Sequence, residues 1–298
     1  MTATVDLLCV GSGAGTLGAA VAAARSGMSV MYVCGRPQQS PTIAQPAPEL
    51  SWADVLSQRW GIEAPAPQTN YYLNELTADL GGPEAATFSE GIDIVEFEGS
   101  APIERSGTGP IPPFYGSRVR TWALRCMRST SGVVFTDISL PGAVKLRDAS
   151  HEAIEVNDIA VLPRERLEEI HVRSWLLDHA RQHGVQMTLG TGLQELVFDD
   201  GQVVGAILNG PYGHDMVLAS HGVMLGTGSP RPAPGRAIGP QTPHPPAARL
   251  CLNSRPASRF FRLEVVVDQE APHTWRRHQA ALTNPGRCAN RRRRTATG

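Results

Sequence analysis

The run Val5-Asp6-Leu7-Leu8-Cys9-Val10-Gly11-Ser12-Gly13-Ala14-Gly15-Thr16-Leu17-Gly18 decides the fold. An alanine-rich run from Leu17 to Arg25 follows it, and Gly27 then leads into the apolar run Ser29–Val33. An apolar run, a glycine cluster, a helix-forming run and a second apolar run within about 30 residues predict a βαβ unit. We therefore expect an α/β fold with a Rossmann-like domain.

The glycine cluster predicts a turn that holds a pyrophosphate. Gly11, Gly13 and Gly15 allow a tight turn and close approach of a phosphate, while the helix N-terminus supplies free N–H groups. A side chain at Gly13 is expected to occupy the place of the phosphate. Thr16 stands where the G-x-G-x-x-G pattern has its third glycine, so we expect slightly looser packing of helix on strand. The alternative is a turn with a structural role alone.

The end of the second predicted strand lacks the acid that normally accepts hydrogen bonds from the adenosine ribose. Cys34 stands there, and its thiol is a weak acceptor. Arg36 follows and would suit a 2′-phosphate, although we interpret it as a solvated loop residue.

Residues 36–162 are predicted to be an irregular insertion. They hold two helical candidates and several strand-like stretches that suggest a small antiparallel sheet: Trp52–Trp60, Tyr71–Leu80, Gly132–Thr136, Ala143–Leu146 and Asp158–Leu162. From Arg164 the apolar spacing predicts a helix of about 20 residues that ends at Gly184. Val185–Leu189 then predicts a strand, and Asp199-Asp200-Gly201 predicts a hairpin turn.

The chain changes character after Ser229. Residues 1–229 carry 14 basic and 25 acidic residues, whereas residues 230–298 carry 13 arginines, ten prolines and three acids. Only Phe260–Val267 resembles a strand there. A segment with so little apolar surface cannot offset the conformational entropy that the chain loses on folding. We therefore predict a domain over residues 1–229 and a largely disordered tail over 230–298.

Two segments together resemble the fumarate reductase/succinate dehydrogenase flavoprotein family, including its 3-ketosteroid dehydrogenase branch. Val5–Val33 resembles the family's flavin-binding start. Residues 164–228 resemble its return segment, with a helix, a strand, the turn Gly190–Leu193, a hairpin and the run Gly222-Val223-Met224-Leu225-Gly226-Thr227-Gly228. The resemblance covers about 95 residues.

The resemblance implies FAD as cofactor and assigns site residues. Its pyrophosphate would contact the turn formed by Gly11, Ser12, Gly13, Ala14, Gly15 and Thr16. Thr227 and Gly228 would lie beside that turn, Gly192 and Leu193 near the adenine, and Cys34 would replace the family's ribose-binding glutamate. The activity implied is an FAD-dependent oxidoreductase acting on a carbon–carbon bond next to a carbonyl, with a small-molecule substrate such as a steroid or a dicarboxylate.

The chain also departs from the family. A Gly-Gly-[ST] stretch is absent from Arg36–Leu50, and the Arg/Pro-rich tail stands where a capping domain would follow Gly228. We expect a truncated family member, with a frameshift as one origin of the tail. A non-catalytic dinucleotide-binding remnant is the alternative, and an NAD(P)-dependent reductase is disfavoured because the late return to Gly226–Gly228 fits the FAD family better.

Other candidate residues have plainer interpretations, and no catalytic residue is assigned. Tyrosines could polarise a carbonyl and arginines could meet an anionic substrate, but packing and solvation explain them equally well: Tyr71, Tyr72, Tyr115, Arg118, Arg120, Arg125 and Arg128. His179 and His183 share a helix face without further ligands, so we predict no metal site. Arg291–Arg294 comes without a recognition fold, so we predict no nucleic-acid partner.

The composition indicates the cellular compartment of the protein. The five cysteines are dispersed without a C-x-x-C pair, which favours a reducing compartment. The first residues lack a positively charged leader, and no apolar run reaches 18 residues. We therefore expect a cytoplasmic protein without a membrane span, and the oligomeric state stays open.

Overall fold

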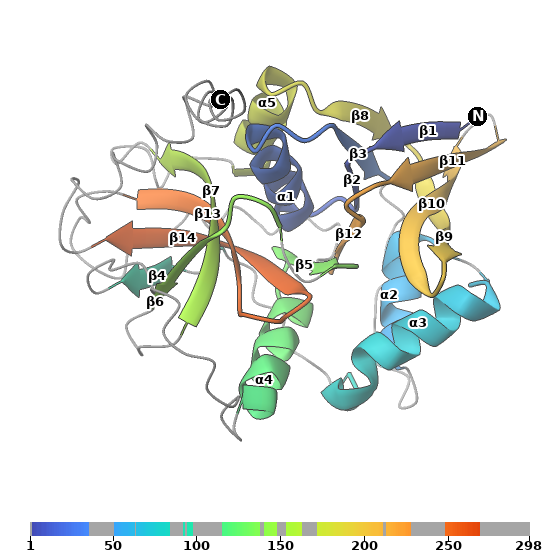
Figure 1. Ribbon diagram of the computed structural model, residues 1–298, viewed down its shortest axis with the longest axis horizontal. Coiled ribbons are helices and arrows are strands. Elements are labelled where there is room, and N and C mark those ends of the chain that lie inside the picture. Colours follow the sequence, from blue (N-terminus) through green and yellow to red (C-terminus); the bar gives the residue numbers. More distant parts are fainter. Residues whose placement is uncertain are drawn as a thin grey trace, which may run out of the picture.

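The computed structural model describes residues 2–35, 51–62, 64–83, 92, 94–97, 115–137, 140–147, 153–162, 172–210, 213–227 and 248–268. The described strands form a ten-stranded sheet in the order β6-β7-β13-β14-β5-β12-β2-β3-β8, with β4 paired to β14, and a four-stranded sheet in the order β1-β11-β10-β9. Helices pack against both sheets (Figure 1). The fold is therefore mixed α/β.

One half of the large sheet is parallel and Rossmann-like. Its strands run β12-β2-β3-β8, and α1 connects β2 to β3. The elements are β2 (Leu7–Val10), α1 (Ala14–Arg25), β3 (Val30–Cys34), α5 (Val172–Gln182), β8 (Gln186–Leu189) and β12 (Val223–Gly226). This arrangement confirms the predicted α/β fold with its βαβ start.

The other half of the large sheet is mostly antiparallel and curls around the far side of α1. It comprises β4 (Ile94–Phe97), β5 (Gly132–Phe135), β6 (Val144–Arg147), β7 (Ala153–Leu162), β13 (Ala248–Ser254) and β14 (Phe260–Asp268). Helix α1 contacts β2 and β3 on one side and β7, β13 and β14 on the other (Figure 1). Enclosure on two sides explains why α1 is built from alanine and glycine and is buried nearly all round.

The four-stranded sheet consists of β1 (Thr2–Val5), β9 (Gly192–Asp199), β10 (Gln202–Gly210) and β11 (Gly213–Ala219). Its predicted hairpin turn is confirmed: Asp200 and Gly201 both have positive φ, 45° and 75°, as a two-residue type I′ turn requires. The expected single strand over residues 5–10 is divided at Asp6. Val5 pairs with Ala219 in this sheet, whereas Leu7 pairs with Val30 in the large one.

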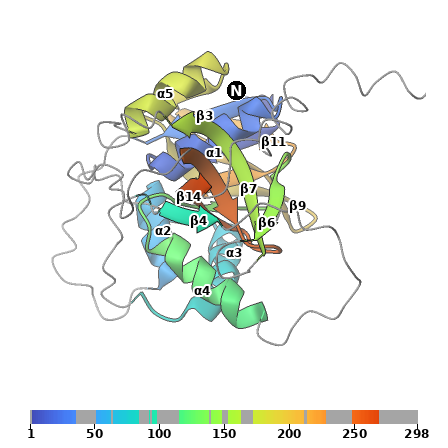
Figure 2. The same cartoon turned by 90° about the vertical axis from the view of Figure 1, so that its left-hand side faces the viewer.

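The segment predicted to be irregular is more regular than expected. The predicted helix Trp52–Trp60 is α2, and the second candidate lies within α3 (Pro67–Thr77) and the 3₁₀ helix η1 (Ala78–Leu80). Helix α4 (Tyr115–Met127) was not predicted; it contacts β5 and β14, and Figure 2 shows it below β14 and β4. The predicted strands exist but extend the ten-stranded sheet rather than forming a small separate one. Of the 20-residue helix predicted from Arg164, α5 is the described part.

The prediction of disorder after Ser229 is wrong for residues 248–254, whereas the strand-like stretch Phe260–Val267 does form a strand within residues 260–268. These residues form β13 and β14, which pair with each other and insert between β7 and β5. Leu250, Leu252 and Leu263 are fully buried in the core that contains α1. A short apolar hairpin was hidden by averaging composition over the Arg/Pro-rich segment, whose remaining residues lie outside the described part of the chain. The division into domains at residue 229 stays a prediction.

Candidate dinucleotide site

The glycine turn connects β2 to α1 as predicted. Gly11 has a φ of 139°, which favours glycine, and its N–H donates to the carbonyl of Val33 at 2.9 Å. Gly13 is the N-cap of α1, without a side chain to cap it, and no acid lies in the first turn. Ser12, Gly13 and Ala14 are half-buried. The first N–H groups of α1 are therefore uncapped by side chains and suited to an oxyanion.

The absence of side chains in this turn has a second cause, which lies within the protein. A Cβ added at Gly13 would lie 3.1 Å from the carbonyl oxygen of Thr130, and one at Gly15 would overlap the carbonyl of Ser131. The expectation that a side chain at Gly13 would fill the phosphate position is therefore corrected, because that direction belongs to the loop between α4 and β5.

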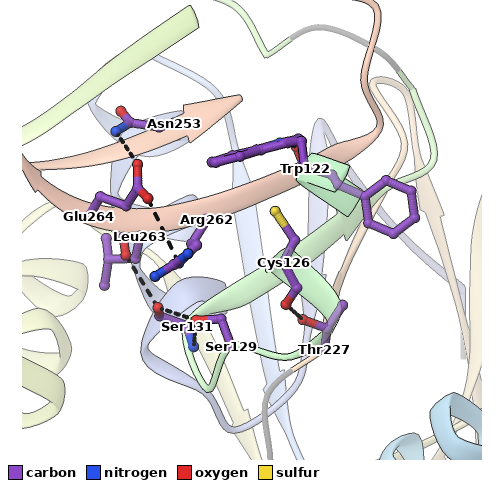
Figure 3. Close-up of polar contacts among 10 residues, drawn as sticks. Trp122, Cys126, Ser129, Ser131, Thr227, Asn253, Arg262, Leu263 and Glu264 are labelled. Carbon is purple, nitrogen blue, oxygen red and sulfur yellow. Dashed lines mark hydrogen bonds and ion pairs between the residues drawn. The ribbon is translucent and has the colours of Figure 1, made fainter. Parts of the chain in front are cut away.

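Figure 3 shows how β14 supports this loop. Ser131 Oγ donates to the carbonyl of Leu263 at 3.2 Å, and the Leu263 N–H donates to the carbonyl of Ser131 at 3.0 Å. Beside it, Arg262 and Glu264 form a buried ion pair, and Asn253 Nδ2 donates to Glu264 Oε2 at 2.8 Å. The segment expected to be a disordered tail thus positions the loop that packs on the glycine turn.

Thr16 occupies the position of the third glycine of the expected pattern. Its side chain is fully buried, and its Oγ1 has no hydrogen-bond partner among the described residues. A Cβ at Gly226 would overlap this Oγ1, and one at Gly11 would approach it to 3.0 Å. Glycines at 11 and 226 therefore make the room that Thr16 needs.

The predicted return segment lies beside the turn. A Cβ at Gly11 would approach the Gly226 backbone to 3.2 Å. The Thr227 N–H donates to the carbonyl of Gly132, and its Oγ1 donates to the carbonyl of Cys126, both at 2.9 Å (Figure 3). Because its N–H and its hydroxyl are both used in these bonds, Thr227 helps to hold the return segment in place beside the turn. Gly228 lies outside the described residues.

Sequence reasoning missed the last turn of α2. Trp60 Nε1 donates to the Gly226 carbonyl at 2.7 Å, and the Arg59 guanidinium donates to the Thr227 carbonyl. Burial lowers the pKa of Arg59 to about 10. A capping box of Ser51 and Asp54 starts this helix. The residues of the box can be seen in the sequence, but the contacts made by the C-terminal end of α2 cannot.

Of the residues predicted to lie near the adenosine, Cys34 is the last residue of β3, and Gly192 and Leu193 are the first two residues of β9. The Gly190 N–H donates to the Cys34 carbonyl at 2.8 Å, which joins the two segments. A Cβ at Gly192 would lie 3.7 Å from the Trp60 carbonyl, whereas Leu193 is 1% exposed and packs into the core. The glycine turn, the return segment at Gly226–Thr227, the end of α2 and the Gly190–Gly192 segment are thus neighbours in the structure.

The tyrosine and arginine candidates do not gather at these segments. Tyr71 is 68% exposed, Tyr72 packs edge-on against Phe198, and the side chain of Tyr115 is outside the described part. Arg118, Arg120 and Arg125 are exposed, Arg128 is half-buried in the loop after α4, and the Arg125 guanidinium lies 5.8 Å from the Trp122 ring centroid.

The two histidines predicted to share a helix face, His179 and His183, have different contacts and burial. His179 Nδ1 donates to the Trp175 carbonyl at 3.0 Å and its ring packs on that indole, while burial lowers the pKa of His183. Within the residues that the structure describes, no group of three or more His, Cys, Asp or Glu is arranged to hold a metal ion. Nor is any helix of that part long and apolar enough to cross a membrane.

Scans against protein-family models and against curated proteins both find no match. Solved structures match over about three quarters of this chain. They include a geranylgeranyl bacteriochlorophyll reductase-like protein from Thermoplasma acidophilum, with 14% identity, 74% of this chain and 38% of that chain covered, and a TM-score of 0.28. Another is the 3-ketosteroid-delta4-(5alpha)-dehydrogenase of Rhodococcus jostii, with 17% identity, 74% and 45% coverage, and a TM-score of 0.28.

A third match is aklavinone-11 hydroxylase in a ternary complex with FAD and aklavinone, with 20% identity, 72% and 31% coverage, and a TM-score of 0.27. This chain therefore spans less than half the length of each of the three. Likenesses this weak carry no weight for the fold or chemistry of this chain. The Rossmann-like assignment rests on its own strand order and on the glycine turn.

Proposed function

We propose that this chain binds FAD and belongs to an FAD-dependent oxidoreductase. The observation that carries the proposal is the first turn of α1, which has no side-chain cap and no acid, and lies at the carboxyl end of β2 beside the β12 return. This is where α/β folds of this kind bind a dinucleotide pyrophosphate. The resemblance of both segments to one flavoprotein family supports FAD over a nicotinamide cofactor.

The residues present fit the ADP half of FAD. Backbone N–H groups at the Ser12–Gly15 turn would hold the pyrophosphate, because no side chain caps the helix end and Ser12, Gly13 and Ala14 are half-buried. The backbone at Thr227 would lie beside it. Cys34 and Gly192 would flank the adenosine, with only a weak acceptor for the ribose hydroxyls.

Bound FAD would supply hydride transfer, and the chain would supply binding and orientation. The family resemblance points to oxidation or reduction of a carbon–carbon bond next to a carbonyl, with a steroid or a dicarboxylate as substrate. The four described cysteines are buried and unpaired with one another, which is compatible with the cytoplasmic location that we propose.

The test is flavin retention followed by turnover. Purified protein is incubated with FAD, desalted and examined by visible absorbance, then mixed anaerobically with steroid and dicarboxylate candidates. The proposal predicts retained flavin peaks and bleaching by a reduced substrate of one class. Retained flavin without any response would favour the non-catalytic remnant, and a colourless protein would overturn FAD binding. A colourless protein that binds NADPH would favour the nicotinamide alternative.

A further inference from the structure

Thr16 places a hydroxyl group where the expected pattern has its third glycine. It is the third residue of α1, after Ala14 and Gly15, and it is fully buried. A threonine in a helix commonly donates to a carbonyl three or four residues earlier. The Oγ1 of Thr16 has no hydrogen-bond partner among the described residues. A buried hydroxyl in this state costs free energy, so its presence calls for an acceptor.

The hydroxyl lies between the ends of two strands. Gly11 directly follows β2, and Gly226 is the last residue of β12. A Cβ added at Gly226 would overlap Thr16 Oγ1, and one added at Gly11 would lie 3.0 Å from it. The two glycines therefore leave a cradle around this oxygen that side chains would fill.

The order of the strands reverses at the same place. Strand β2 pairs on one side with β3, which follows it through α1, and on the other side with β12, which comes from much later in the chain. Open α/β sheets bind ligands outside the carboxyl ends of their strands at such a reversal. The hydroxyl of Thr16 and the uncapped first turn of α1 are therefore two independent features of one place.

A phosphate oxygen would supply the acceptor. It accepts hydrogen bonds, and a threonine hydroxyl donates one and rotates to suit its partner. We propose that Thr16 Oγ1 donates a hydrogen bond to a phosphate oxygen of the nucleotide bound at the glycine turn. The bond forms only with the ligand, so the cost of the buried hydroxyl is carried by the nucleotide-free chain and relieved on binding. This inference rests on the proposed nucleotide site and adds a side-chain contact to its backbone N–H groups.

The test separates a contact with the ligand from a role in folding. Thr16→Val keeps the shape of the side chain and removes the hydroxyl, whereas Thr16→Ser keeps the hydroxyl. Thr69→Val is the matched control, because Thr69 is equally buried but its Oγ1 accepts from the Leu196 N–H at 3.1 Å. Binding of adenosine, AMP, ADP and FAD to the full chain is measured by calorimetry, and thermal melting of the nucleotide-free proteins is followed by circular dichroism.

Thr16→Val should weaken ADP and FAD binding by about threefold to tenfold and leave adenosine binding unchanged, because adenosine has no phosphate. Thr16→Ser should bind ADP within about twofold of the wild type. Without nucleotide, Thr16→Val should melt no lower than the wild type, because the valine methyl group needs no partner. Thr69→Val should behave in the opposite way, with a lower melting temperature and unchanged ADP affinity.

The ligand series identifies the phosphate. A loss that is already present with AMP assigns the contact to the phosphate next to the ribose, and a loss that appears only with ADP assigns it to the second phosphate. Unchanged ADP affinity in Thr16→Val, or an equal loss with adenosine, would overturn the contact. A Thr16→Val protein that melts well below the wild type would assign the hydroxyl to the fold and overturn it as well.

The same measurements separate this inference from the FAD proposal. If the wild-type chain binds ADP through Thr16 but takes up no FAD, the contact stands and the FAD proposal falls. If FAD is bound and Thr16→Val binds both nucleotides as the wild type does, the contact falls and the FAD proposal stands. If the wild type binds neither nucleotide, both fall.

Discussion

The indole Nε1 of Trp60 donates a 2.7 Å hydrogen bond to the carbonyl oxygen of Gly226, the last residue of β12. This bond fixes the end of α2 to the strand that lies beside the glycine turn. The adjacent Arg59 reaches the Thr227 carbonyl. Two residues of one helix therefore hold the return segment in place from a part of the chain that was expected to be irregular.

Replacing Trp60 by phenylalanine should cost more stability than the same change at Trp52. Both indoles are buried, but Trp52 Nε1 has no hydrogen-bond partner among the described residues. Loss of the Trp60 bond should make Trp60→Phe less stable than Trp52→Phe by about 1 kcal/mol, as measured by urea denaturation. Equal losses would show that the bond to Gly226 contributes nothing.

Gly226 and Thr16 should behave as a coupled pair. Gly226→Ala pushes a methyl group into Thr16 Oγ1, which should cost about 1–3 kcal/mol of folding free energy. Thr16→Ala removes that oxygen, so the double variant should be more stable than the sum of the two changes by about 1 kcal/mol. Gly82→Ala is the control, because nothing lies within 4 Å of the added Cβ. Simple additivity would contradict the contact.

Leu263 should be a core residue although it lies in the Arg/Pro-rich segment. It is fully buried, and its side chain would collide with a Cβ at Gly18 of α1. Leu263→Ala should lower the free energy of unfolding by about 2–5 kcal/mol. Leu189→Ala, at a leucine that is 68% exposed, should change it by less than about 0.5 kcal/mol. A Leu263→Ala variant as stable as wild type would restore the interpretation of residues 230–298 as a disordered tail.

Asp6, at the junction of the two sheets, should make stability depend on pH. Hydrogen bonds from the Ser29 backbone N–H and hydroxyl, each 2.8 Å, and from the Ser220 hydroxyl at 3.0 Å lower its pKa. Because the pKa of Asp6 is lower in the folded protein than in the unfolded chain, the carboxylate stabilises the fold when the pH is above the unfolded-state pKa. This contribution fades as the pH falls below about 4. Asp6→Asn should therefore be less stable than wild type near pH 7 and approach it in acid. A difference independent of pH would contradict the assignment.

The sequence was informative wherever a local signal defined the element. The glycine turn and the Asp200-Gly201 hairpin each depend on a few neighbouring residues, and both are present. Their backbone conformations depend on residues that accept a positive φ, such as Gly11 and Gly201. Such signals need no knowledge of the rest of the fold.

The predictions failed where a structural feature depends on contacts between residues that are far apart in the sequence. Helix α4 buries Trp122, Ala123, Cys126 and Met127 on one face, but the arginines at 118, 120 and 125 obscured this periodicity. Strand β13 is buried on both faces, with Leu250 and Leu252 toward α1 and Cys251 toward a second cluster, so it lacks strand alternation. The partners of Arg59 and Trp60 lie more than 160 residues away. The sequence offers no signal for pairings of that kind.

If the uncapped first turn of α1 binds the pyrophosphate of FAD, a negative charge placed in that turn should weaken FAD binding. FAD is titrated into the wild-type chain, into Ser12→Asp and into the neutral, isosteric Ser12→Asn, with folding followed by circular dichroism. We expect Ser12→Asp to remain folded but to bind FAD at least about tenfold more weakly than wild type, because a carboxylate repels phosphate there, while Ser12→Asn binds nearly as wild type does. Equal FAD affinity in all three proteins, or no FAD binding by the wild type, would contradict the claim.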